Sequence, residues 1–84
     1  MLEAEAREKA EGARAESGVP EGFQLLWAKQ RYIEMAKEGV AGTEGSYLVR
    51  DFLVWVAHFS KDMAWWELAL DDKKGRVIRV ERSR

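Results

Sequence analysis

Apolar and polar positions change their spacing along this chain, and each spacing predicts a different element. Residues 2–17 are rich in Ala, Glu, Arg and Lys, which favour a helix, but beyond Leu2 they include no large apolar side chain for burial. A break at residues 17–20 follows. We therefore expect a helical arm over residues 1–18, loosely attached or frayed, and a single domain over residues 19–84.

Residues 21–38 place apolar side chains three and four positions apart, which is typical of an amphipathic helix. Pro20 is well placed to open this helix, and Gly39 to end it. Phe23 and Trp27 are spaced i and i+4 but fall on the polar side of the predicted helix. We therefore expect both aromatic side chains to be exposed and available to a partner.

Residues 47–59 fit two kinds of element. As a helix they would be apolar nearly all round, with Arg50, Asp51 and His58 grouped on one side. As a strand they would carry apolar side chains on both faces. The valine and aromatic content, and the two strands predicted next, favour a long central strand.

The last third of the chain predicts an antiparallel hairpin. Two alternating runs, Met63–Leu70 and Arg76–Arg82, flank a turn that ends at Gly75, which supplies the positive φ that such a turn requires. Alternation divides the side chains between the two faces of the sheet. One face is expected to carry Trp66, Leu68, Leu70, Ile78 and Val80. The other is expected to carry Trp65, Glu67, Ala69, Val77, Arg79 and Glu81.

Together these elements predict an α+β fold: an N-terminal helix, a main helix from Glu21 to Glu38, and a three-stranded antiparallel β-meander. The main helix is expected to cover one face of the sheet, yet the long strand over residues 47–59 is apolar on both faces. One helix cannot cover two faces. The second face therefore needs the N-terminal helix, another subunit or a partner protein to cover it.

Two short segments are similar to parts of known families. Residues 36–43, Ala-Lys-Glu-Gly-Val-Ala-Gly-Thr, resemble the segment after the cystatin helix, where a Gln-x-Val-x-Gly loop enters the clefts of cysteine proteases. Val40 and Gly42 match that loop, and Glu38 stands in place of its Gln. Residues 66–78 resemble the hairpin of PepSY domains, small extracytoplasmic modules often tied to peptidase regulation. These resemblances imply a cystatin-like outline and an inhibitor-like loop at Val40 and Gly42.

The amino-acid composition indicates the class of protein and excludes several kinds of functional site. The 84 residues include 46% hydrophobic and 35% charged side chains, which is typical of a globular chain. There is no cysteine, so a disulfide, a thiolate metal site and a thiol nucleophile are excluded. No signal peptide or membrane-spanning run is recognisable, and we expect a cytoplasmic protein that does not enter a membrane.

The polar residues do not form a recognisable catalytic or metal-binding motif. His58 is the single histidine, and Asp51 or Asp62 could partner it as a general base, but a structural role is expected. One histidine and scattered carboxylates give no metal-ligand spacing. Asp71 and Asp72 fit turn chemistry. We therefore expect no enzyme activity and no cofactor.

The aromatic side chains predict where a partner would bind. Four tryptophans are many for a domain of this size, and Trp is enriched at the centres of interfaces. We predict a homodimer and a non-enzymatic protein-binding module, of which a peptidase inhibitor or regulator is the specific version. The predicted contact residues are Phe23, Trp27, Trp55, Trp65, Val77 and Arg79.

Two other functions stay open. Basic side chains of the C-terminal hairpin would neutralise phosphates in a nucleic-acid-binding protein, although the net charge of −1 argues against a general binder. These residues are Lys73, Lys74, Arg76, Arg79, Arg82 and Arg84. A small-ligand or enzymatic pocket between helix and sheet would be lined by Tyr32, Trp55 and His58.

Overall fold

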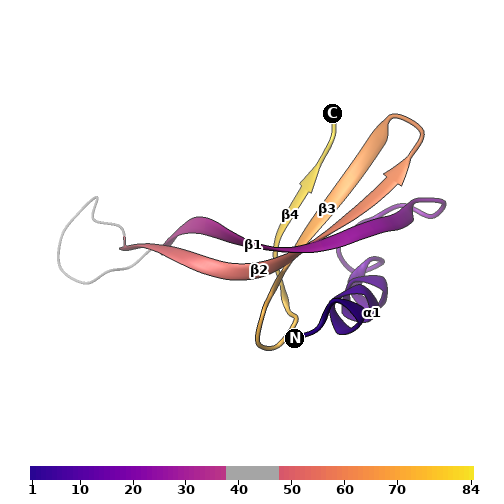
Figure 1. Cartoon of the computed structure of the whole chain (residues 1–84). Coiled ribbons are helices and arrows are strands. Elements are labelled where there is room, and N and C mark those ends of the chain that lie inside the picture. The colour runs from indigo at the N-terminus through magenta and orange to yellow at the C-terminus, as the bar shows by residue number, and fades with distance from the viewer. Residues whose placement is uncertain (38–47) are drawn as a thin grey trace.

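The computed structural model describes residues 1–37 and 48–84 and consists of one helix packed on one sheet (Figure 1). The elements in chain order are α1 (Glu3–Ala13), β1 (Gln24–Lys37), β2 (Leu48–Lys61), β3 (Ala64–Asp71) and β4 (Val77–Arg82). The strands lie in the order β1-β2-β3-β4, and each neighbouring pair is antiparallel. Within the described ranges, no helix has the length and apolar character that a membrane span needs.

The predicted fold class is wrong in one element, and this changes the architecture. Residues 21–38 were expected to form the main helix, but Gln24–Lys37 is the edge strand β1. Residues 1–37 and 48–84 therefore form one short helix and a four-stranded sheet, and are mostly β, in place of two helices and a three-stranded meander. The physical reason lies in β2, whose backbone needs hydrogen-bond partners along both of its edges. β3 supplies partners along one edge only, and a helix over residues 21–38 would have left the other edge unpaired.

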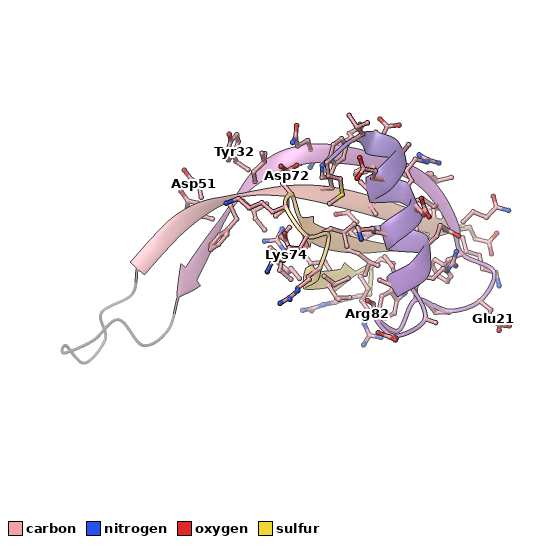
Figure 2. All side chains as sticks on the ribbon, turned by 90° about the horizontal axis from the view of Figure 1, so that it is seen from below. Glu21, Tyr32, Asp51, Asp72, Lys74 and Arg82 are labelled. Carbon is pink, nitrogen blue, oxygen red and sulfur yellow. The ribbon has the colours of Figure 1, made fainter. Side chains whose placement is uncertain are left out.

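β2 is an inner strand that pairs with β1 along one edge and with β3 along the other. Residues 47–59 fitted either a helix or a strand, and the structure places Leu48–Lys61 in β2. β3 pairs with β2 only from Val54 onward. On the N-terminal side of Val54, β2 pairs with β1 alone, and the two strands form a two-stranded arm, residues 32–37 and 48–53 (Figure 1). Tyr32 and Asp51 lie on this arm, beyond the part of the sheet that α1 covers (Figure 2).

The main core lies between α1 and one face of the sheet, which we call the helix-covered face. Ala6 and Ala10 of α1 are completely buried against it. The large apolar side chains come from the sheet, where Phe59, Leu68 and Leu70 are also completely buried. Alanines allow the helix backbone to approach the sheet closely, so α1 needs no large side chain of its own. The expectation of a loosely attached helix therefore differs from the structure, which packs α1 into the core.

Asp72 ties the start of α1 to the sheet. Trp55 Nε1–H donates a hydrogen bond to Asp72 Oδ1 at 2.9 Å, and Gln30 Nε2–H donates to the same oxygen at 2.8 Å. The Met1 ammonium lies 3.7 Å from this oxygen and donates to the Asp72 carbonyl at 3.5 Å. Side chains of β1 and β2 and the chain terminus thus converge on one carboxylate in the β3–β4 turn.

The β3–β4 turn is organised by Asp71. Gly75 has a φ of 69°, which confirms the predicted left-handed turn residue. Asp71 Oδ1 accepts hydrogen bonds from the backbone N–H groups of Lys73 and Lys74, and Oδ2 accepts one from Arg76. Burial raises the pKa of the Asp71 carboxyl, but these backbone donors together lower it by more, so its pKa lies below the ordinary value of 3.8.

An irregularity between β3 and β4 exchanges two predicted faces. The register shifts between Ala69 and Leu70, so that Ala69 pairs with Arg79 while Leu70 pairs with Val77. Ile78 is the extra residue, as in a β-bulge. As a result Val77 packs on the helix-covered core and Ile78 on the opposite face, the reverse of the strict alternation expected from the sequence.

The close approach of α1 makes a first prediction about stability. Replacing Ala10 by Leu adds side-chain volume where no space is available, and we expect it to lower the free energy of unfolding by about 1–3 kcal/mol. The matched control is Ala4→Leu on the exposed side of the same helix, which we expect to change it by less than about 0.5 kcal/mol. Urea unfolding measures both, and equal effects would contradict the close packing of α1.

The low pKa of Asp71 makes a second prediction. Because this pKa is lower in the folded than in the unfolded chain, the carboxylate stabilises the fold above the unfolded value, and this contribution is lost as the pH falls through the folded value. We expect Asp71→Asn to lower the urea midpoint at pH 7, and the difference from the unsubstituted protein to shrink below pH 3.8. Asp51→Asn, on the exposed arm, should leave the midpoint at pH 7 unchanged. A difference that persists undiminished at about pH 2 would be inconsistent with this role for the carboxylate.

Candidate protein-binding face

The second face of the sheet is covered by no other element of the described chain, and we call it the open face. α1 lies against the opposite face only (Figures 1 and 2). Strand register and the contacts of the second apolar cluster assign side chains to the open face. They are Trp27, Lys29, Arg31, Ile33, Phe52, Val54, Val56, His58, Trp65, Glu67, Ala69, Ile78, Arg79 and Glu81.

The open face has a small apolar core of its own. Val54 is completely buried, and Val56 and Ala69 are nearly so. The side chains packed around them are only partly buried and come from β1, β2 and β4: Trp27, Ile33, Phe52 and Ile78. An antiparallel sheet that turns one face to water normally carries polar side chains there. This face instead has an apolar centre with a partly exposed aromatic and aliphatic rim.

Three aromatic rings form a row across β1, β2 and β3 on the open face. The Trp27 and His58 ring centroids are 4.8 Å apart, and their planes differ by 6°. The His58 and Trp65 centroids are 6.0 Å apart, and their planes differ by 26°. His58 therefore has an indole on each side, because its neighbours come from the two strands that flank β2. We call these three side chains the aromatic row.

Charged groups contact the first and the middle ring of the aromatic row. Lys29 Nζ lies 4.7 Å from the centroid of the Trp27 ring, and Arg31 Cζ lies 5.5 Å from it, both within the range of cation–π attraction. His58 Nδ1 is 2.8 Å from Glu67 Oε2. The stacked rings thus have cations on the β1 side and a carboxylate on the β3 side.

The contacts of His58 occupy much of its ring. The one histidine is packed between two indoles and paired with Glu67, so its ring faces and Nδ1 are already used. In the part of the chain that the structure describes, no group of three or more His, Asp or Glu side chains could hold a metal ion. Buried side-chain nitrogen and oxygen atoms without a hydrogen-bond partner, a common mark of a functional site, do not occur among the described residues.

The structure brings together three of the six predicted contact residues and separates the other three. Trp27, Trp65 and Arg79 share the open face. Phe23, Trp55 and Val77 lie on the helix-covered core, where Trp55 is buried and donates its indole N–H to Asp72. The inhibitor-like loop residues Val40 and Gly42 lie outside the described residues, and the peptidase-inhibitor version stays a prediction.

The predicted nucleic-acid residues do not form one patch. Lys73, Lys74 and Arg76 belong to the β3–β4 turn, whereas Arg82 ends β4 with its guanidinium 5.4 Å from the Trp66 ring. Arg82 lies six positions after Arg76 along an extended strand, which is roughly 20 Å. Between them, Arg79 turns to the open face and pairs with Glu81 at 3.0 Å.

The predicted small-molecule pocket also does not form. Tyr32 is 73% exposed on the arm, Trp55 is buried under α1, and His58 lies on the opposite face. A groove of about 480 Å³ lies instead between α1 and the start of β1. Two basic side chains, Arg7 and Arg14, line it, and Arg14 already donates hydrogen bonds to the carbonyls of Pro20 and Phe23 and to Glu11.

Sequence reasoning missed two of the three cations of the open face, Lys29 and Arg31. Both belong to the segment that was interpreted as a helix, where they fall among other polar side chains. As a strand, the same segment alternates, and Trp27, Lys29, Arg31 and Ile33 share one face. That alternation was the available signal, but the helical spacing of the same residues obscured it.

Comparisons of this chain with known protein families, curated proteins and solved structures find no match. The cystatin and PepSY resemblances therefore stay predictions, and function has to be argued from the open face itself.

The aromatic row makes a third prediction. A double-mutant cycle with Trp27→Ala and His58→Ala should give a coupling free energy of about 0.5–1.5 kcal/mol, because each single replacement already removes the stacked contact. The control cycle pairs His58→Ala with Tyr32→Ala, whose side chain is exposed on the arm, and should give less than about 0.5 kcal/mol. Urea unfolding supplies the four stabilities of each cycle. A coupling between Trp27 and His58 no larger than the control would argue against the stack.

Proposed function

We propose that this chain is a non-enzymatic protein-binding module and that the open face is its binding surface. The observation that carries the proposal is the partly exposed aromatic and aliphatic rim of that face, which packs on a buried apolar centre and consists of Trp27, Ile33, Phe52 and Ile78. Apolar surface of this kind, bordered by charged side chains, is typical of sites where another protein docks.

The aromatic row favours a protein over a planar ligand. A nucleic-acid base or a sugar ring binds by stacking on an aromatic face. Here the faces of the Trp27 and His58 rings are already occupied, because His58 stacks on Trp27 and Trp65 and two cations lie over the Trp27 ring. The remaining ring edges, and the aliphatic stems of Lys29 and Arg31, are surfaces on which protein side chains pack.

The distribution of charge favours a protein over a nucleic acid. The open face carries the cations Lys29, Arg31 and Arg79 but also the carboxylates of Glu67 and Glu81. Phosphate backbones select surfaces of one sign, whereas protein interfaces combine both signs in complementary positions.

Site-specific photo-crosslinking tests the proposal and is our fourth prediction. A benzophenone side chain replaces Lys29 on the open face in one variant and Glu3 on the exposed side of α1 in the control. Irradiation in cells that naturally make the protein should give covalent protein adducts at position 29 and not at position 3. Gel mobility and mass spectrometry identify the adducts.

Three results bear on this proposal. Protein adducts specific to position 29 support it. Adducts that contain nucleic acid would overturn it in favour of phosphate recognition. Equal labelling at positions 29 and 3, or no labelling at either, would contradict a binding role for the open face.

A further inference from the structure

We infer, resting on the proposed function, that the partner of the open face contributes an extended acidic segment that pairs with the outer edge of β1. The segment would add a further strand to the sheet and place its carboxylates beside Lys29 and Arg31. The inference rests on the unpaired backbone groups of this edge and on the charge of the side chains that border it.

β1 is an edge strand, because it pairs with β2 on one side and with no described strand on the other. Its pairing with β2 is regular from Trp27 to Lys37, since the irregularity lies between Leu25 and Trp27. A strand at the edge of a sheet presents N–H and C=O groups that can pair with another chain. The outer edge of β1 is therefore a place where a partner can add a strand.

The register shows which backbone groups of β1 point outward. The Leu53 C=O accepts a hydrogen bond from the Asp72 N–H at 3.2 Å, so the backbone groups of Leu53 point away from β1. Its partner on β1 is Tyr32, whose N–H and C=O therefore point away from β2. Backbone direction alternates along a strand, so Gln30 and Ala28 also direct these groups outward. No hydrogen bond joins the outward groups to another described residue.

The side chains along this edge carry unpaired positive charge on the open face. Lys29 and Arg31 alternate with the outward residues, are exposed and form no ion pair with a described carboxylate. Their charged groups lie over the Trp27 ring and so remain on the surface of the sheet. Arg79, the other cation of this face, is already paired with Glu81 at 3.0 Å. The positive charge left for a partner therefore lies at the β1 edge.

This edge sets the side-chain pattern of an added antiparallel strand. Residues that lie directly opposite each other in such a pair have their Cβ atoms about 4.5–5.5 Å apart, and opposite charges there attract. Two acidic residues, two positions apart, would face Lys29 and Arg31. Apolar residues on either side of them would face Trp27 and Ile33, which are only partly buried. The residues between would lie on the other face of the sheet, where Tyr32 is 73% exposed.

The same charges disfavour a second copy of this chain at this edge. Two antiparallel β1 strands related by a twofold axis near Gln30 would place Lys29 of each copy opposite Arg31 of the other. Like charges directly opposite each other destabilise a strand pair. The edge therefore resists pairing with itself and attracts a strand of the opposite charge.

Binding of a synthetic strand tests the inference and is our fifth prediction. The probe is the peptide Leu-Thr-Glu-Thr-Glu-Thr-Leu, amidated at its C-terminus and joined to a fluorophore at its N-terminus by a Gly-Ser linker. Fluorescence anisotropy with the full chain at low salt should show saturable binding with a dissociation constant below about 1 mM. The same peptide with Gln in place of Glu should bind at least about tenfold more weakly.

Charge reversal shows whether the two cations hold the peptide. Lys29→Glu with Arg31→Glu should weaken binding of the Glu peptide at least about tenfold and should bind the corresponding Lys peptide instead. The matched control, Lys61→Glu with Arg84→Glu, makes the same change in net charge away from this edge and should bind the Glu peptide unchanged. All four positions are exposed, so the variants should fold, and circular dichroism checks this.

Backbone pairing has a signature of its own, which alternates along β1. Saturating peptide should slow the hydrogen exchange of the outward Gln30 and Tyr32 amides, as measured by NMR. The amides of Lys29 and Arg31 already face β2 and should be unchanged. Methylation of the Thr nitrogens removes the peptide N–H groups that face β1 and should abolish binding. Methylation of the Glu nitrogens, whose N–H groups face away, should preserve it.

The outcomes distinguish this inference from the proposed function. No binding at about 1 mM, equal binding of the Glu, Gln and Thr-methylated peptides, or protection that does not alternate would each overturn the inference. If position 29 then still crosslinks to another protein, the proposed function stands with a different mode of docking. If there is neither peptide binding nor a specific adduct, both fail.

Discussion

The structure depends on the burial of β2, a strand with apolar side chains on both faces and backbone groups to satisfy on both edges. Val54 and Val56 face one way, and Trp55, Ala57 and Phe59 face the other. Such a strand is stable only between two neighbouring strands and between two apolar layers. β1 and β3 meet the first requirement. The second is met by α1 on one face and, within the described residues, by side chains alone on the other.

The apolar side chains of the sheet are covered in different ways on its two faces. On the helix-covered face, alanines of α1 allow close contact with large side chains of the sheet, and Asp72 holds the chain terminus in place. On the open face, Val54 is fully buried beneath partly exposed neighbours, and the row of Trp27, His58 and Trp65 packs ring against ring. The open face therefore keeps a partly exposed aromatic rim at the surface, where a partner can reach it.

Much of the fold followed from local chemistry. The Ala-rich N-terminal segment forms a helix, residues 48–61 form the central strand that their valine and aromatic content favoured, and Gly75 takes the positive φ required after Asp71. Helix propensity, strand composition and turn stereochemistry act over a few neighbouring residues, so they can be read from the chain. Of the six predicted contact residues, Trp27, Trp65 and Arg79 share one face of the sheet, and their role as contacts stays a prediction.

The sequence by itself determined that residues 48–61 form a strand and where the last hairpin turns. Only the tertiary structure decided that Gln24–Lys37 is a strand. The spacing of its apolar residues fits a helix or a strand, and its pairing with the edge of β2 selects the strand. That pairing carried Lys29 and Arg31 to the open face. Tertiary register also exchanged Val77 with Ile78, since a bulge depends on how two strands align and not on either strand alone. The turn that closes the last hairpin depends on local stereochemistry, but the faces that Val77 and Ile78 occupy depend on how β4 aligns with β3.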